Sequence, residues 1–408
     1  MPADSLQSFQ VDNLYLLIGE NPLPNLVAAR TLVHPEGTVI LVHTTHTTPM
    51  AKALASLLSK NPEASVKHRF LPLGDGQANG FKIRQTIQAS VRTLKGSIGM
   101  NYTGGTKAMA VHAHSALEQL RPQVVFSYLD PHLLKMIIDQ LDAPPLQFAV
   151  DLPLQLEDIL MLHGLTWHTG TTPHRDPIHP ELATQLAALL VNLEHSKSWQ
   201  DWRRKRVDPL KTACDNQKTL SVQSVSLAPL AEPLQATLAQ HLNVKNNHLH
   251  LSNSCAPSFD HPCQLLGWLH GLWLEDFVLA SIQALAPQYG IHDYGLSLQI
   301  QNPQQRQDRF PQFELDVAFT RGYQLFAISC TTAQDKATCK KKLFEATQRA
   351  RQLGGAEARI GLVCASRRPQ LLQSELELVT RNRKLKVFGI PQWGTLDRHI
   401  AEWIHQNT

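Results

Sequence analysis

The chain has 408 residues, of which 43% are hydrophobic and 18% are charged, and its formal net charge is +4 at neutral pH. This composition excludes a disordered or low-complexity protein, and the length predicts two or three domains of about 150 residues each. A net charge this small does not indicate a surface that binds nucleic acid as a whole, so any electrostatic argument has to be local.

The sequence shows neither a membrane span nor an export signal. No apolar run approaches the roughly 20 residues that a membrane helix needs. Residues 1–13 lack the basic start and apolar centre of a secretion signal. We therefore expect a cytoplasmic protein without a membrane partner.

The six cysteines do not have the spacing of a disulfide framework or of a zinc site. None forms a Cys-x-x-Cys pair, and Cys255 and Cys263 are eight residues apart with His261 between them. Zinc sites usually contain tighter pairs, so we expect free thiols.

Residues 13–130 alternate between short apolar segments and segments of helix length. Strands are predicted at residues 14–18, 38–43, 66–71, 97–101 and 124–129. Such alternation predicts a parallel sheet covered by helices on both faces. Ligands of these sheets bind beyond the carboxyl ends of the strands, at residues 19–22, 44–47, 74–76 and 102–107 in this chain.

The middle of the chain, residues 150–260, is less regular. Leucines at helical spacing follow Pro180, and a second helix is predicted at residues 233–242. The first helix runs toward Trp199 and Trp202, which precede the basic run at residues 203–206. Such a run usually forms a solvated face; alternatively, the indoles stack on bases while the arginines bind phosphates.

The pattern becomes regular again from residue 264. An apolar helix carries Glu275, and the strand at residues 313–319 places Glu314 and Asp316 on one face. A returning strand at residues 323–331, a helix at 340–353 that ends at Gly354 and Gly355, and strands at 359–365 and 385–390 complete the prediction.

A glycine-rich turn at residues 101–107 joins the fourth predicted strand to a helix. Gly104 and Gly105 allow close approach to a ligand, the helix N-terminus offers unpaired N–H groups, and Lys107 adds a positive charge. The combination suits phosphate, although it matches neither the ATPase loop nor G-x-G-x-x-G. A tight turn with a solvated lysine explains the same residues.

This turn, with Met109 after it, resembles the signature of the CRISPR-associated Rossmann-fold (CARF) sensor domains, and residues 18–25 are similar to the opening loop of CARF proteins with a C-terminal nuclease domain. The resemblance implies a Rossmann-like, doubly wound sheet in a homodimer that binds a cyclic oligoadenylate, most often the tetramer, across its two-fold axis. The residues that would line the ligand are Thr103, Gly104, Gly105, Thr106 and Lys107, with Gly19, Asn21, Thr44 and His46 as weaker candidates.

The segments around Glu275, Asp316 and residues 328–331 resemble the successive motifs of a PD-(D/E)xK nuclease, a restriction-endonuclease-like mixed α/β fold. The resemblance implies that Glu275, Asp316 and Glu314 hold Mn²⁺ or Mg²⁺. The third motif usually has Glu-x-Lys, but Ser329 and Thr331 occupy those positions here. The role of the lysine would pass to Lys342 or to another lysine in its vicinity: Lys336, Lys340 or Lys341.

Residues 336–351 carry six basic groups and one acidic group, a net +5, which would attract a polyanion beside this site. Together the resemblances imply a sensor domain at residues 1–155, a connecting segment at 156–262 and a nuclease-like domain at 263–408. The leading hypothesis is a cyclic tetra-adenylate activated endonuclease of type III CRISPR defence that cleaves RNA or DNA. The alternatives are a non-catalytic switch with a degenerate nuclease domain and a sensor that cleaves the ring without metal.

Overall fold

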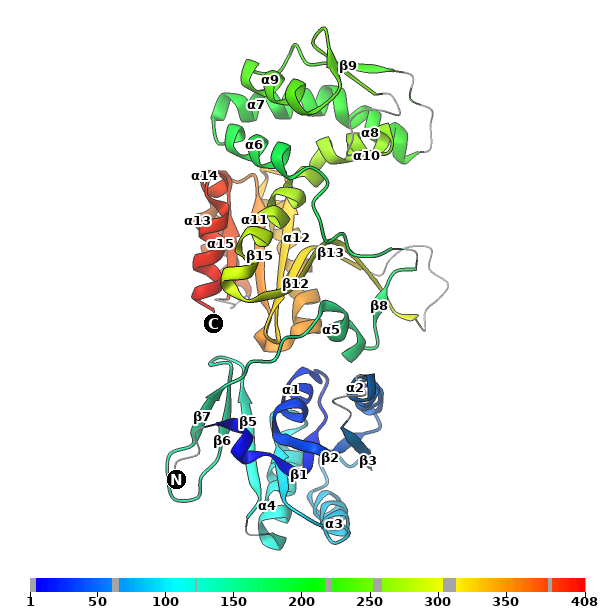
Figure 1. The fold of residues 1–408 in the computed structure, drawn as a ribbon, viewed down its shortest axis with the longest axis vertical. Helices are drawn as coiled ribbons and strands as arrows, with labels where there is room; N and C mark the ends of the chain where they lie inside the picture. Colours follow the sequence, from blue (N-terminus) through cyan, green and yellow to red (C-terminus); the bar gives the residue numbers. More distant parts are fainter. Residues whose placement is uncertain are drawn as a thin grey trace.

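The computed structural model describes residues 5–60, 66–121, 123–169, 171–216, 220, 222–251, 259–303, 313–380 and 384–407. Three parts follow one another along the longest axis of the molecule (Figure 1). An N-terminal sheet lies at one end, a C-terminal sheet lies in the middle, and a group of helices from the middle of the chain lies at the other end.

The N-terminal sheet has the order β3-β2-β1-β4-β5-β6-β7. Its strands are β1 (Val11–Leu17), β2 (Val33–Thr44), β3 (Lys67–Gly74), β4 (Ile98–Asn101), β5 (Val125–Asp130), β6 (Lys135–Ile138) and β7 (Leu146–Ala149). The first five are parallel, as expected, whereas β6 and β7 form an antiparallel edge that the sequence pattern did not predict.

Helices cover both faces of this sheet. They are α1 (Leu23–Leu32), α2 (Thr48–Lys60), α3 (Gly80–Val91) and α4 (Lys107–Leu120). One apolar cluster joins α1 and α2 to the sheet and another joins α3 and α4 to it, which is the doubly wound arrangement. Because both faces are covered, β1 is buried from Asn13 to Leu17 and shows no polar alternation there.

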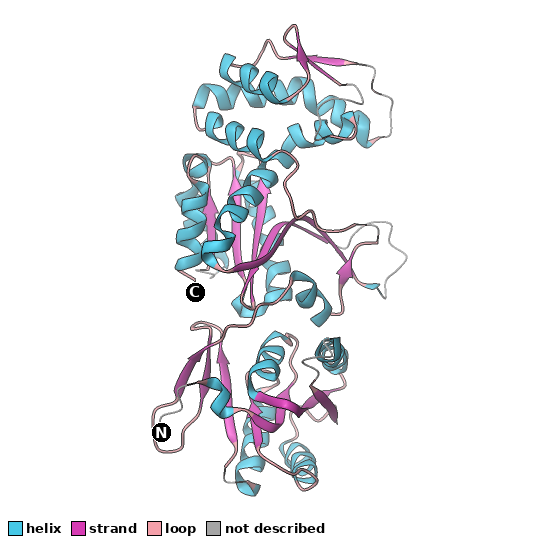
Figure 2. Ribbon diagram, viewed as in Figure 1, coloured by secondary structure: helices cyan, strands magenta, loops and turns pink. Residues whose placement is uncertain are grey.

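The helical part contains α6 (Pro180–Leu190), α7 (Leu193–Trp202), α8 (Asp208–Asp215), α9 (Glu232–His241) and α10 (Pro262–Gly267), with a π-helical turn at Arg203–Val207. A small sheet, β9 (Ser224–Ser226), β10 (Val244–Lys245) and β11 (His248–His250), packs with them. Figure 2 shows that helices dominate this part.

Two hypotheses about the middle segment are wrong. Trp199 and Trp202 are 3% and 0% exposed, and Trp202 donates to the Ser226 carbonyl, so these indoles form core and cannot stack on bases. Cys214 and Cys263 form a disulfide with Cα atoms 5.8 Å apart, because the fold brings α8 and α10 together across 49 residues of sequence. Cys255 lies outside the described residues.

The C-terminal sheet has the order β16-β15-β14-β13-β12-β8. Its strands are β8 (Thr166–Trp167), β12 (Ile291–Gln301), β13 (Phe313–Arg321), β14 (Gln324–Thr331), β15 (Arg359–Cys364) and β16 (Leu385–Phe388). Strands β12 to β14 are antiparallel and β14 to β16 are parallel, which is the expected mixed sheet.

The helices of this part are α5 (Leu156–Leu162), α11 (Trp273–Tyr289), α12 (Lys336–Gly354), α13 (Pro369–Thr380), α14 (Ile390–Trp393) and α15 (Leu396–His405). Helix α11 contacts β12 and β13, while α12 contacts β14 and β15. Two separate apolar clusters, one with α11 and one with α12, lie against the sheet. The predicted domain boundaries remain predictions, although α5 and β8, from the predicted connecting segment, pack with this sheet.

One long apolar stretch bears on the expectation about membrane spans. Residues 262–289, which include α10, a π-helical turn at Trp268–Leu272 and α11, are long and apolar enough to cross a membrane, by length and composition alone. Most of this stretch is buried inside the protein, as in a core helix. Asp276 is 1% exposed there and accepts hydrogen bonds from Trp268 Nε1 and from the main chain of Ile178 and His179, so this acid has a structural role.

The N-terminal and C-terminal sheets share a packed joint. The hairpin turn between β13 and β14 inserts Tyr323 into the apolar cluster of α1 and α2. The Gly322 carbonyl in this turn accepts a hydrogen bond from Leu154 N, and Asn21 lies directly against Gly355 at the end of α12. The hairpin and α12 therefore both rest on the N-terminal part.

The disulfide leads to a stability prediction. Closing a loop of this length stabilises a fold by about 2–4 kcal/mol, because the cross-link restricts the unfolded chain. A reducing agent should therefore lower the melting temperature of the wild-type protein in a calorimetric scan. The double variant Cys214→Ser/Cys263→Ser should melt lower and should not respond to the reductant; an unchanged wild-type scan would contradict the pairing.

Candidate active site

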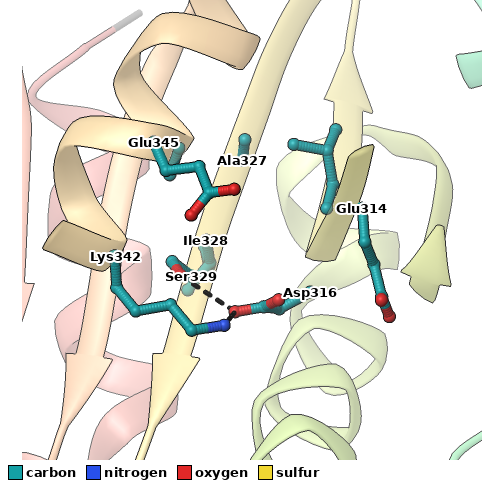
Figure 3. Close-up of a pocket in the computed structure, with 9 residues that line it drawn as sticks. Glu314, Asp316, Ala327, Ile328, Ser329, Lys342 and Glu345 are labelled. Atoms are coloured by element: carbon teal, nitrogen blue, oxygen red, sulfur yellow. Dashed lines mark hydrogen bonds and ion pairs between the residues drawn. The ribbon is translucent and has the colours of Figure 1, made fainter. Parts of the chain in front are cut away.

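The C-terminal sheet opens where β13 and β14 separate. Their pairing runs from the hairpin turn to Val317 and Ile328 and goes no further. Asp316 and Ser329 are the next residues on the two strands, and their side chains face each other across the opening (Figure 3). The main-chain N–H of Cys330 is therefore available to a side chain, and it donates to Asp316.

Asp316 is held by three donors at one oxygen. Its Oδ2 accepts hydrogen bonds from Ser329 Oγ at 2.9 Å, Cys330 N at 2.7 Å and Lys342 Nζ at 3.4 Å. Its Oδ1 accepts none from the described part of the chain, and the side chain is 13% exposed. The carboxylate is thus fixed in orientation with one oxygen still available to a ligand.

The structure distinguishes among the four candidate lysines. Lys342 reaches Asp316, whereas Lys336 and Lys340 both pair with Glu375 on α13, and Lys341 is exposed. Burial acts to lower the pKa of Lys342, but attraction to Asp316 and Glu275 outweighs it and raises that pKa, so the amine stays charged.

Two further carboxyl groups lie in the field of Asp316. Burial raises the pKa of Glu275 well above its usual value, and the charges of Asp316 and Glu314 raise it further. The pKa of Glu314 is also raised, by burial and then by Asp316. Three acids with one lysine among them therefore repel one another, and such crowding of perturbed groups is typical of functional sites.

Ser297 lies between these acids and was not found from the sequence. Its Oγ donates to Glu275 Oε2 at 3.3 Å, and it also hydrogen-bonds Glu314. Ser297 has φ = 51°, a left-handed conformation that is rare for a non-glycine residue in a strand. Its neighbours Leu296 and Leu298 pair with Val317 and Leu315, so Ser297 is an unpaired residue opposite Asp316. Backbone strain of this kind concentrates at functional sites.

A cavity of about 220 Å³ occupies the opening. Its polar lining consists of Glu314, Asp316, Ser329, Lys342 and Glu345. Figure 3 shows the Glu345 carboxylate pointing toward Ser329 and Asp316 from α12, one turn after Lys342. In the sequence, Glu345 is the single acid of the basic segment at residues 336–351, and no motif marks it as a site residue. Thr331 does not line the cavity; its hydroxyl accepts a hydrogen bond from Ala333 N.

The donor set suits a hard divalent cation. Carboxylate oxygens are the ligands that Mg²⁺ and Mn²⁺ prefer, and a cation would relieve the repulsion among the three acids. Among the described residues, however, no group of three His, Cys, Asp or Glu side chains is gathered closely enough to hold a metal ion. The chemistry of Glu275, Glu314 and Asp316 fits the expected metal, and their role as ligands remains a prediction.

The candidate ligand loop lies at the carboxyl ends of β1 and β4. A Cβ on Gly104 would overlap the Leu17 carbonyl oxygen, and a Cβ on Gly19 would lie 3.1 Å from Gly105 N. Gly105 has φ = 74°, which also favours glycine. These glycines therefore let the two loops pack in direct contact. The packing of the loops requires glycine at these positions whether or not a ligand binds.

Around this turn, Thr106 caps α4 by accepting from Met109 N, and the Thr103 hydroxyl accepts from Leu129 N. Lys107 is exposed and has no ion pair with any described residue. The structure thus has an exposed helix N-terminus with a free ammonium group beside it, as the phosphate hypothesis requires.

The weaker candidates lie on the neighbouring loops. Thr44 is buried and bonds to Thr47 within its own turn, and His46 lies 3.5 Å from Glu20 at the surface. Asn21 Oδ1 accepts from Leu23 N at the start of α1. Roles for these residues in ligand binding remain predictions.

Two solved structures have a similar overall fold. The chain is similar to protein VC1899 from Vibrio cholerae, with a TM-score of 0.72 and 18% identity over 97% of this chain and 98% of the other. It is also similar to Can2 from Sulfobacillus thermosulfidooxidans in complex with cyclic tetra-adenylate, with a TM-score of 0.67 and 16% identity over 96% of this chain and 99% of the other.

The chain has the fold of these two solved structures. This confirms the resemblance inferred from the sequence at the level of fold, and identities this low carry no site residue across. No family model matches the sequence, and the search of curated proteins found no match.

The crowded acids lead to a pH prediction. A carboxyl group whose pKa is higher in the folded protein costs stability above that pKa, and the cost disappears as the pH falls to the unfolded value. Metal-free Glu275→Gln protein should therefore melt higher than wild type at pH 8, by about 2–4 °C for each kcal/mol relieved. The difference should vanish as the pH approaches the ordinary value of 4.5, measured by calorimetry in EDTA.

Glu375→Gln is the matched control. The pKa of Glu375 is lowered by its hydrogen bonds to Lys336 and Lys340, so this variant should lose stability at pH 8 rather than gain it. A Glu275→Gln variant that is destabilised equally at pH 8 and pH 5 would contradict the proposed repulsion.

Proposed function

We propose that this protein is a metal-dependent endonuclease that is activated by cyclic tetra-adenylate, a cyclic oligoadenylate, and that cleaves RNA or DNA in type III CRISPR defence in the cytoplasm. The observation that supports this most directly is the approach of Lys342 to Asp316 in the opening between β13 and β14. Lys342, from the neighbouring helix α12, would supply the lysine that the sequence motif lacks at Thr331.

The residues of the opening have separable roles in this proposal. Glu275, Glu314 and Asp316 would hold Mn²⁺ or Mg²⁺, which polarises the scissile phosphate and lowers the pKa of a bound water. Ser329 and the Cys330 N–H orient Asp316 so that its Oδ1 faces the ligand side. Lys342 presents a positive charge where negative charge develops on the phosphate.

The N-terminal sheet would act as the sensor. The first turn of α4 offers N–H groups, and Lys107 adds a charge that no described residue neutralises. Can2 was solved in complex with cyclic tetra-adenylate on the same fold. A ring with two-fold symmetry suits two copies of this loop, so we propose that the protein is a homodimer.

The second candidate function is a switch that binds nucleic acid or a partner without cutting. Ser329 in place of the usual glutamate, together with acids that are not gathered into a metal cluster in the described residues, favours this alternative. A third candidate, cleavage of the ring by the sensor, would proceed without metal.

Cleavage assays test the proposal. Labelled single-stranded RNA, single-stranded DNA and supercoiled plasmid should be cut only with cyclic tetra-adenylate and Mn²⁺ both present. Lys342→Ala and Asp316→Asn should each lower the rate by at least about 10²-fold, the cost typical of removing one charged group from a transition-state site. Lys341→Ala, the exposed neighbour on the same helix, should have a much smaller effect.

Other outcomes point elsewhere. Thermal stabilisation by the ring with no cutting of any substrate would contradict the nuclease and leave the switch. Disappearance of the ring itself in EDTA would indicate that the sensor cleaves its ligand.

The sensor half has its own prediction. Lys107→Ala should weaken binding of cyclic tetra-adenylate by about 10- to 100-fold, because one charge-assisted contact is worth about 1.5–3 kcal/mol. Isothermal titration against wild type measures this, with Lys95→Ala, a lysine outside the predicted ligand loops, as the control. Equal affinities for wild type and Lys107→Ala would remove this lysine from the site.

A further inference from the structure

A second, larger cavity lies where the N-terminal and C-terminal parts meet. Its volume is about 470 Å³, and we call it the interface cavity. Its lining residues are Glu20, Asn21, His46, Pro49, Met50, Leu162, His163, Gly164, Arg351 and Gln352. The cavity therefore combines the loops after β1 and β2, where the ligand of a parallel sheet is expected, with the last turn and a half of α12.

Arg351 is the permanently cationic residue of this lining. It is exposed, and it has no acidic partner among the described residues. The acid of the cavity, Glu20, already faces His46 at 3.5 Å. Burial lowers the pKa of His163, whose Nε2 lies 2.8 Å from the Leu353 carbonyl oxygen, so this imidazole is neutral near pH 7. An arginine that has no carboxylate partner and lies in a concave site suits phosphate, because its guanidinium can bind phosphate through two N–H groups.

The end of α12 is held in place at this cavity. Asn21 from the loop after β1 packs against Gly355, where a side chain on the glycine would overlap it, and Gly355 has φ = 60°. His163 at the end of α5 contacts the Leu353 carbonyl. Arg351 therefore projects from a fixed position into the cavity that Asn21 and His46, two of the predicted ligand-binding residues, also line.

We propose that Arg351 binds a phosphate of the cyclic oligoadenylate, so that the ligand is held by the sensor loops on one side and by α12 of the nuclease part on the other. This inference rests on the proposed function, and it adds a recognition residue from outside the sensor sheet.

Helix α12 then carries one residue for each of two sites: Lys342 for the opening between β13 and β14, and Arg351 for the interface cavity. Lys342 and Arg351 are nine residues apart on one uninterrupted helix, which corresponds to roughly 13 Å along its axis. A ligand that binds Arg351 therefore contacts the same rigid helix that positions Lys342 beside Asp316.

Binding of a fluorescent cyclic tetra-adenylate to the full-length protein tests the inference. Arg351→Ala should weaken binding by about tenfold or more, and the slope of log affinity against log salt should fall by roughly 0.7, the value for one phosphate contact to a single strand. Arg351→Lys should retain part of the affinity, and Arg351→Glu should lose more than Arg351→Ala. Melting curves of each variant establish that it is folded.

Arg349→Ala is the matched control. Arg349 lies on the same helix with the same charge, but its guanidinium lies over the Phe313 ring at 4.6 Å and does not line the interface cavity. This variant should keep the wild-type affinity and salt slope.

The outcomes separate the inference from the function on which it rests. If wild type and Arg351→Ala bind the ring with the same affinity and the same salt slope, the proposed contact of Arg351 is wrong and the proposed sensor function is unaffected. If Arg349→Ala weakens binding as much as Arg351→Ala, the effect is general electrostatics and the specific contact is wrong. If wild type does not bind the ring, both the inference and the sensor function fail.

Discussion

The repulsion among Glu275, Glu314 and Asp316 is the constraint on which the C-terminal site depends. Burying one acid costs free energy, and placing three in one field costs more unless cations or hydrogen-bond donors compensate. The fold supplies compensation mainly to Asp316, through Ser329, Cys330 N and Lys342. Among the described residues, Glu275 and Glu314 receive only the Ser297 hydroxyl and the more distant lysine, so burial and the neighbouring carboxylates raise their pKa values.

The fold retains this free-energy cost instead of removing it, and that fact carries information about the site. A charge pair that serves stability is usually satisfied completely, because a buried acid without a partner can be replaced by an apolar residue at a gain. Here the strand opens, a serine adopts a left-handed conformation, and an oxygen of Asp316 is left available. These features together support the proposed binding of a cation and a polyanion at this site over a role in the packing of the sheet.

The sequence predicted the elements better than the site. The five parallel strands were accessible as short apolar runs, and the helix with Glu275 and the strand with Asp316 were accessible through their local periodicity. The sequence narrowed the catalytic lysine to four candidates but could not select Lys342. The choice depends on which lysine of α12 points toward the strands that carry Asp316 and Ser329, and only the structure shows this. Ser297 and Glu345 were missed because nothing local marks them. Ser297 lies opposite Asp316 on β12, a strand that was not predicted, and Glu345 reaches the cavity through the pitch of α12. The disulfide and the burial of Trp199 likewise follow from long-range packing that no pattern of single residues encodes.

The insertion of Tyr323 into the core of the N-terminal sheet has a thermodynamic consequence. The hairpin that carries Asp316 and Ser329 shares its apolar contacts with the helices beside the sensor loops, and α12 shares its end with the same loops. Any free energy that passes from one part to the other through these contacts passes equally in reverse. Under the proposed function, a nucleic acid bound in the opening between β13 and β14 would strengthen the binding of the activating ligand, so that the occupancy of the sensor would depend on the substrate as well as on the signal.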